Sequence, residues 1–179
     1  VHEYQHALQY ANSYYGASKI LHWLGGELAW GAAQSIAIPN WFFEGNAVLA
    51  ETQYSEQGRG RIPTFFNEFR SFAIENKTPK YDKLRNGSFQ DLLPDHYRLG
   101  YLMVRYGREK YGEEYWTNVL KRASSYSGII YPFSRALKQE GGEHSRKMYK
   151  NMMVDLSAEW NSSKDIFGES VFPVKRNEV

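Results

Sequence analysis

The sequence predicts a mainly α-helical fold, and three observations lead to this prediction. Apolar residues recur at threefold and fourfold spacing through most of the 179 residues, the pattern of helices with one buried face. No segment alternates polar and apolar residues over the length of a strand. Prolines and glycines interrupt the periodic stretches where short helices should end. An apolar content of 42% is sufficient for one hydrophobic core.

These interruptions define the first predicted helices. The first helix runs from about His2 to Tyr14 and stops near Gly16, and the second covers about 27–37, ending before Pro39. A short strand at 36–38 is the alternative interpretation of the end of this second helix. The sequence therefore predicts two helices before the apolar segment that starts at Trp41.

The remaining helices are bounded by similar signals. Proline suits the first turn of a helix and glycine suits its exit, and both occur at the predicted boundaries. The predicted helices cover about 41–55, 63–75, 95–111, 113–125, 132–139 and 143–160, with a polar loop over 76–87. The chain thus divides into one domain over residues 1–160 and a C-terminal tail or linker over residues 161–179.

Charge and composition exclude several classes of protein. The formal net charge is only +2, and lysines and arginines are scattered among acids, so no basic stripe indicates nucleic-acid binding. The longest apolar stretch, 28–43, contains Gln34, Ser35, Pro39 and Asn40, which makes it too polar for a membrane span. The chain has no cysteine, so any metal must be held by histidine and carboxylate.

Residues 2–6 read His-Glu-Tyr-Gln-His, which is an HExxH pattern. Two histidines four residues apart project from one face of a helix, so both imidazoles can reach a single Zn²⁺. Glu3 is then the candidate general base, because it reaches water at the metal instead of the metal itself. Histidines at this spacing also occur as ordinary polar surface, so the pattern alone leaves both interpretations open.

Glu44 is the candidate third ligand. It lies in the segment Trp-Phe-Phe-Glu-Gly-Asn-Ala, residues 41–47, where an acid interrupts an otherwise apolar helix start. Gly45 and Ala47 would let this helix approach the first helix closely and bring the carboxylate to the histidines. The alternative is an acid in the first helical turn, stabilised by the helix dipole. Asn12 stands where the metzincin pattern requires a third histidine, which excludes that class.

Residues 41–47 resemble the Trp-x-x-Glu-Gly-x-Ala segment of gluzincin peptidases, the aminopeptidase N-like enzymes and their bacterial relatives of the peptidase MA-like type. Residues 97–104 are similar to the Tyr-x-x-Gly helix start that follows downstream in the same families, and Tyr111-Gly112 fits the end of that helix. The three motifs occur in the family order. Their joint occurrence is far more specific than any one of them.

The resemblance implies a zinc metallopeptidase acting on a peptide or protein substrate. In that family the metal ligands would be His2, His6 and Glu44, the general base would be Glu3, and Tyr97 would donate to the oxyanion. The resemblance also implies that the chain forms the helical zinc-binding and C-terminal part of a zincin-like domain. The supporting sheet would lie upstream, in the same protein or a partner chain. Bacterial relatives are often exported, which suggests the cell envelope or secretion.

The sequence also departs from the family. His6 and Glu44 are separated by 37 residues, a longer interval than in aminopeptidase N-like enzymes, so the broader bacterial group is the better match. The segment that reads a substrate's free amine in the aminopeptidases lies upstream of HExxH, so exopeptidase and endopeptidase activity both stay open. Two alternatives to an enzyme are an inactive gluzincin-like binding or scaffold module of a larger bacterial assembly, and a helical domain with a fortuitous HExxH.

Five further residues complete the candidates. His96 could be a second oxyanion donor, although a histidine at a helix start is more often a surface or cap residue. Glu51, two turns after Glu44 on the same face, is expected to be an exposed acid, and the alternative is that it orients a ligand histidine. Tyr101 is expected to pack in the core. His22 and His144 have no motif around them and are interpreted as structural or surface residues.

Overall fold

The computed structural model describes residues 1–126 and 131–167, with only the backbone described for residues 163–167. The described elements are, in order, α1 (His2–Ala11), α2 (Gly16–Ala37), α3 (Asn40–Tyr54), the 3-10 helices η1 (Arg59–Arg61) and η2 (Pro63–Phe66), α4 (Asn67–Glu75), α5 (Tyr81–Asn86), α6 (His96–Tyr111), α7 (Tyr115–Ser124), α8 (Pro132–Gly141) and α9 (Ser145–Phe167). None of the described residues forms a strand, so the mainly α prediction is confirmed.

Several predicted boundaries are wrong. The first helix ends at Ala11, three residues before its predicted end at Tyr14. The second helix begins at Gly16 and not near residue 27, with a break at Gly26, whose φ of 67° and ψ of −162° are not helical. Glycine adopts this conformation without a steric penalty. The alternative strand at 36–38 does not form, because α2 continues to Ala37. The predicted loop over 76–87 contains α5, a helix of six residues that is too short to show helical periodicity.

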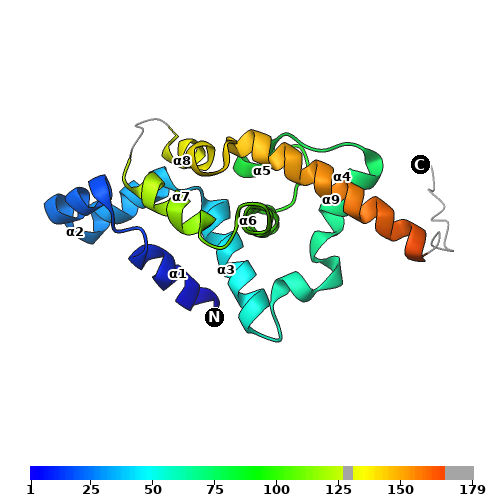
Figure 1. The fold of residues 1–179 in the computed structure, drawn as a ribbon, viewed down its shortest axis with the longest axis horizontal. Helices are drawn as coiled ribbons and strands as arrows, with labels where there is room; N and C mark the ends of the chain where they lie inside the picture. Colours follow the sequence, from blue (N-terminus) through cyan, green and yellow to red (C-terminus); the bar gives the residue numbers. More distant parts are fainter. Residues whose placement is uncertain (127–130, 168–179) are drawn as a thin grey trace.

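Helix α6 lies at the centre of the molecule. In Figure 1 it is seen almost end-on, with α3, α7 and α9 around it. Its middle is apolar and fully buried, and it joins a core that extends through the neighbouring helices. Members of this core with essentially no exposure include Trp41, Phe42, Phe69, Leu99, Met103, Val119, Leu137, Met148 and Met152. The core therefore fixes α3 against α6, and these are the helices that carry Glu44 and Tyr97.

The crossing of α3 and α6 is unusually close because it is made by two glycines. A Cβ atom built on Gly45 would lie 2.0 Å from the carbonyl carbon of Gly100, and one built on Gly100 would lie 1.8 Å from the Trp41 carbonyl oxygen. No side chain fits at either position. The expectation that Gly45 makes room for the first helix is therefore wrong, because α6 fills the space beside it.

Helix α2 extends away from the rest of the molecule at one end (Figure 1). Its few buried residues are small or polar, whereas Trp23 is 82% and Leu28 is 88% exposed. Over residues 16–25, polar side chains such as Lys19 and His22 are mixed with exposed apolar ones, so the sequence shows no one-sided periodicity there. No helix among the described residues is long and apolar enough to span a membrane.

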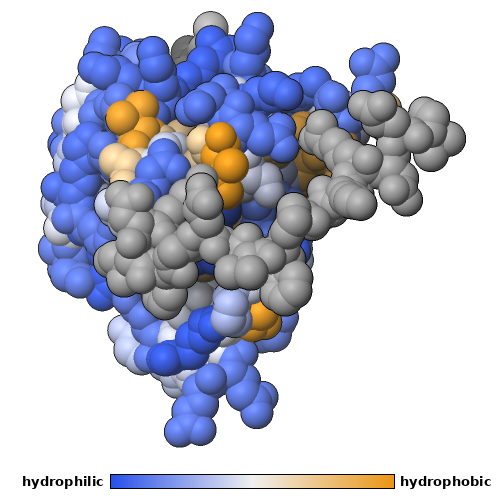
Figure 2. Space-filling view, turned by 90° about the vertical axis from the view of Figure 1, so that its right-hand side faces the viewer, coloured by the Kyte–Doolittle hydropathy of each residue, from blue (hydrophilic) through white to orange (hydrophobic). Residues whose placement is uncertain are grey.

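The opposite end of the molecule is formed by α4 and α9. The face there is mostly hydrophilic, and hydrophobic residues appear on it in separate spots (Figure 2). Helix α9 continues to Phe167, beyond the end predicted near residue 160, so the first part of the expected tail is helical. Residues 168–179 of that tail lie outside the described ranges.

Candidate metal centre

Three donor atoms of the predicted ligands lie close together. The Nε2 atoms of His2 and His6 are 3.2 Å apart. Glu44 Oε2 lies 3.3 Å from His2 Nε2 and 3.5 Å from His6 Nε2. All three side chains are about one-fifth exposed. The structure therefore brings together His2, His6 and Glu44 at a site that is shielded but open to solvent.

Two contacts between α1 and α3 hold these residues in place. The Gln9 side-chain amide donates a hydrogen bond of 2.9 Å to the Phe43 carbonyl oxygen, next to Glu44. The Tyr10 ring stacks on the Phe43 ring, with centroids 5.7 Å apart and planes at 21°. Because His2 and His6 are one turn apart on α1, fixing this helix against Phe43 directs both imidazoles toward Glu44.

Each histidine has a second partner on its other ring nitrogen. His6 Nδ1 lies 2.9 Å from Gln9 Oε1, and His2 Nδ1 lies 3.1 Å from Glu51 Oε2. An acceptor on Nδ1 keeps the proton there and leaves the Nε2 lone pair free for a metal. The expectation that Glu51 is an exposed acid is wrong. Its side chain is only 14% exposed and makes the contact that was the alternative interpretation.

Arg59 in η1 completes the surroundings of Glu51. Arg59 Nε lies 2.6 Å from Glu51 Oε1 and Nη2 lies 3.2 Å from Oε2, while the Arg59 backbone N–H also donates to Oε1. Partial burial acts to raise the pKa of Glu51, but the hydrogen bonds and charge of Arg59, with a smaller contribution from His2, outweigh it and lower that pKa. Glu51 is therefore a carboxylate at neutral pH.

Tyr97 lies in the first turn of α6, close to His2. Its ring centroid is 6.4 Å from that of His2, and the Arg59 guanidinium carbon lies 4.8 Å from it. Burial raises the pKa of Tyr97, and the negative charge of Glu44 raises it further, while Arg59 acts in the opposite direction. The phenol therefore keeps its proton at neutral pH, and it can act as a hydrogen-bond donor.

Glu3 follows His2 directly on α1 and is exposed. A residue one position along a helix is rotated by about 100°, so Glu3 lies beside the histidine face and not on it. Glu3 has no hydrogen bond or ion pair with any other described residue, so its carboxylate is available to a substrate or to water. Its charge is among those that raise the pKa of Tyr97.

The donor set fits zinc. Ligand atoms at about 2.0–2.1 Å from a tetrahedral zinc ion lie about 3.3–3.4 Å from one another, and the separations here are 3.2, 3.3 and 3.5 Å. Two imidazoles and one carboxylate are a common ligand set of catalytic zinc sites that keep a fourth position open. Acceptors on both Nδ1 atoms favour the tautomers that such a site needs.

The other histidines lie outside this cluster. His96 begins α6, and its ring lies against Tyr97 with centroids 4.4 Å apart. His22 packs between Tyr14 and Trp30, at 5.2 and 5.8 Å. His144 Nδ1 lies 3.1 Å from the Ser134 carbonyl oxygen. His22 and His144 therefore have the structural role expected of them.

Sequence reasoning missed two residues of the site. Gln9 is 2% exposed, which is unusual for a glutamine and reflects its two bonds to His6 and Phe43. Its spacing of three residues from His6 on one helix face was the available signal. Arg59 lies in a glycine-rich loop, and nothing in that segment pointed to His2 or Tyr97. Tyr101, in contrast, is buried as expected, against Phe65 and Phe66.

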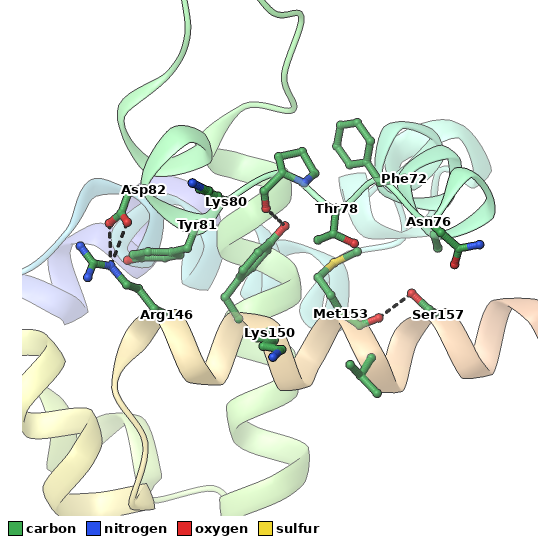
Figure 3. Close-up of a pocket in the computed structure, with 14 residues that line it drawn as sticks. Phe72, Asn76, Thr78, Lys80, Tyr81, Asp82, Arg146, Lys150, Met153 and Ser157 are labelled. Carbon is green, nitrogen blue, oxygen red and sulfur yellow. Dashed lines mark hydrogen bonds and ion pairs between the residues drawn. The ribbon is translucent and has the colours of Figure 1, made fainter.

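A groove of about 780 Å³ lies elsewhere, between α4, α5 and α9. Figure 3 shows Arg146 and Asp82 paired at one end of it, while Met153 and Phe72 contribute apolar surface farther along. The Tyr149 hydroxyl donates to the Pro79 carbonyl oxygen across it. No candidate ligand or catalytic residue lines this groove, so it is separate from the metal centre.

Comparison with known proteins adds no family to this geometry. No protein-family model matches the sequence, and no curated protein or solved structure matches the chain. The function therefore has to be inferred from the site residues and their contacts.

Proposed function

We propose that this chain carries the metal centre and part of the catalytic machinery of a zinc-dependent peptidase of the gluzincin type. One observation supports the proposal most directly. The donor atoms of His2, His6 and Glu44 converge to separations of 3.2–3.5 Å, although Glu44 comes from a different helix. Hydrogen bonds among the two histidines and Glu44 account for these separations one at a time, whereas a single metal ion would account for all three together.

In the proposed site, His2, His6 and Glu44 hold the zinc ion. Zinc, when bound, would supply a Lewis acid that lowers the pKa of water and polarises the scissile carbonyl. Glu3 accepts the proton of the attacking water and later delivers it to the leaving amine. The protonated phenol of Tyr97 donates a hydrogen bond to the oxyanion that develops on the carbonyl oxygen.

The substrate class follows from the same residues. A general base and an oxyanion donor near one metal ion are the groups that hydrolysis of a peptide bond in a peptide or protein requires. The remaining expectations from the resemblance belong to this proposal. They are a zincin-like domain completed by an upstream part of the protein or a partner chain, and a location in the bacterial envelope or outside the cell.

The proposal is tested with the full-length protein. Metal analysis after purification should find about one zinc per chain, and Glu44→Gln should lower this content strongly because it removes the anionic ligand. Digestion of a peptide library should yield cleavage with the wild type and none with Glu3→Gln, which should retain zinc. Glu27→Gln is the matched control, since Glu27 is an exposed acid on α2, away from the ligands.

The outcomes separate the alternatives. A protein that binds no zinc, even after incubation with the metal, overturns the proposal and leaves a helical domain with a fortuitous HExxH. Zinc binding without cleavage, in the wild type as in Glu3→Gln, overturns the enzyme and favours an inactive binding or scaffold module. Loss of cleavage in Glu27→Gln as well would mean that the effect of Glu3→Gln is not specific.

A further inference from the structure

Arg59 contacts both Glu51, which lies beside His2, and Tyr97. Its guanidinium holds the two carboxylate oxygens of Glu51, at 2.6 and 3.2 Å, and its guanidinium carbon lies 4.8 Å from the Tyr97 ring centroid. Glu51 in turn contacts His2. One residue from η1 therefore connects a proposed metal ligand with the proposed oxyanion donor, which lie on different helices.

His2 Nδ1 can form a hydrogen bond with either of two neighbouring groups. This atom lies 3.1 Å from Glu51 Oε2 and 2.9 Å from Arg59 Nη2. A guanidinium can only donate, so a hydrogen bond from Arg59 to Nδ1 would place the proton of His2 on Nε2 and block a metal there. A bond from Nδ1–H to Glu51 leaves Nε2 unprotonated, as a metal requires. The choice of partner therefore decides whether His2 can be a ligand.

Charge favours Glu51 as the partner, because a carboxylate can accept the proton of His2 Nδ1 whereas a guanidinium cannot. The guanidinium makes a two-point contact with Glu51, and its Nη2 atom, which carries two N–H groups, also lies 2.9 Å from His2 Nδ1. The Arg59 backbone N–H adds a third bond to the same carboxylate. Glu51 is thus held with Oε2 toward His2, and its charge favours a proton on Nδ1.

We infer that Arg59 is a positioning residue of this site. It holds Glu51 so that the carboxylate accepts from His2 Nδ1 and keeps Nε2 free for zinc, and its guanidinium packs over the ring of Tyr97. This inference rests on the proposed function, because it assigns Arg59 a role toward the proposed ligand and the proposed oxyanion donor. It assigns no contact between Arg59 and substrate.

The test measures zinc affinity of the full-length protein by competition with a chromophoric chelator. Arg59→Ala should weaken affinity by about 10–100-fold, the range for losing an outer partner of a metal ligand. Arg61→Ala is the matched control. Arg61 lies in the same short helix but donates to the Thr52 carbonyl oxygen, and its loss should leave affinity within about twofold.

Two further measurements exclude a purely structural effect. Glu51→Gln should weaken zinc binding by a similar factor. The double variant, Glu51→Gln with Arg59→Ala, should bind zinc no less tightly than the single variant of lower affinity, because both substitutions remove the same contact. Millimolar methylguanidinium should restore part of the affinity of Arg59→Ala, since it can occupy the vacated space and bind Glu51. It should not change Arg61→Ala. Arg59→Lys, which keeps the charge but not the paired contact, should be intermediate.

Equal zinc affinity in Arg59→Ala and Arg61→Ala would overturn the positioning role while leaving the proposed function intact. Additive losses in the double variant, or no recovery with methylguanidinium, would also overturn it, because Arg59 would then act on the fold and not through Glu51. A wild-type protein without zinc affinity would overturn the proposed function itself.

Discussion

Gly45 and Gly100 meet at the crossing of α3 and α6, and a Cβ atom on Gly45 would lie 2.3 Å from the Gly100 Cα. This contact has a consequence for the site. Glu44 precedes Gly45, and Tyr97 is one turn before Gly100 on α6, so the glycine pair sets the separation between a proposed ligand and the proposed oxyanion donor. The two motifs that resemble the gluzincin segments are thus joined in space by their glycines.

Gly100→Ala should destabilise the protein. The added methyl group would fall 1.8 Å from the Trp41 carbonyl oxygen, a backbone atom that cannot move without shifting α3. We expect a loss of about 1–3 kcal/mol in the free energy of unfolding, the usual cost of overpacking a core. Urea denaturation followed by circular dichroism measures it.

Gly31→Ala provides the control for this prediction. Gly31 lies inside α2 with no atom within 4 Å of an added Cβ, so alanine there should be neutral or stabilise the protein by about 0.5–1 kcal/mol. If Gly100→Ala unfolds at the same urea concentration as the wild type, the close crossing of α3 and α6 is not rigid, and the role assigned to the glycine pair is wrong.

How well each helix could be predicted depended on how strongly its buried and exposed faces differ in polarity. The start of helix α6 was predicted near Pro94 or Asp95, within two residues of His96, because its buried and exposed faces differ strongly and Asp95 accepts a capping hydrogen bond from the Arg98 backbone N–H. Residues 16–25 were missed since polar and exposed apolar side chains are mixed there without one buried face, and α5 was missed since six residues hold fewer than two turns.

How well the site could be predicted depended on whether its residues contact neighbours that are close in the sequence. The histidine pair follows from helical spacing, and Glu44 was found through its motif; their donor atoms do lie together. Glu51 and Arg59 meet across the loop between α3 and η1, and only the folded chain brings them to His2. No period or motif in one sequence encodes the pairing of Glu51 with Arg59, so Arg59 could not be predicted. Glu51 had been considered as an outer partner of a ligand histidine, and the spacing of Gln9 from His6 was a usable signal.

Gln9→Leu should weaken both the fold and zinc binding. It leaves His6 Nδ1 and the Phe43 carbonyl oxygen without their partner, which costs about 1–3 kcal/mol for a buried polar group. Zinc affinity should fall by about 10–100-fold, because His6 loses the acceptor that fixes its tautomer. Thermal unfolding and chelator competition measure the two effects. Gln5→Leu is a control on the same helix, and an equal loss of zinc affinity there would contradict the assignment.

Tyr97→Phe should separate catalysis from metal binding. The variant keeps the ring that Arg59 contacts but removes the hydroxyl, so zinc content should be unchanged while kcat falls by roughly 10²–10³-fold, as for other oxyanion donors. Tyr101→Phe, one turn on and buried against Phe65, should keep most of the activity. If Tyr97→Phe cleaves peptides as fast as Tyr101→Phe, the phenol is not the oxyanion donor.

Glu143→Gln should make the protein less stable at neutral pH but not at low pH. Partial burial acts to raise the pKa of Glu143, yet the hydrogen bonds that it accepts from Lys110 and Asn151 and the charge of Lys110 lower it below the ordinary value of 4.5. A carboxyl whose pKa is lower in the folded than in the unfolded state stabilises the fold above the unfolded value, and this contribution is lost as pH falls through the folded value.

The wild type should therefore be more stable than Glu143→Gln by about 1 kcal/mol at pH 7, the scale of a hydrogen-bonded charged group. The difference should shrink as the pH is lowered past 4.5, because Glu143 binds a proton first in the unfolded chain and then in the folded one. Urea denaturation across this range measures it. A difference that is the same at every pH would mean that Glu143 contributes through its shape and not through its charge.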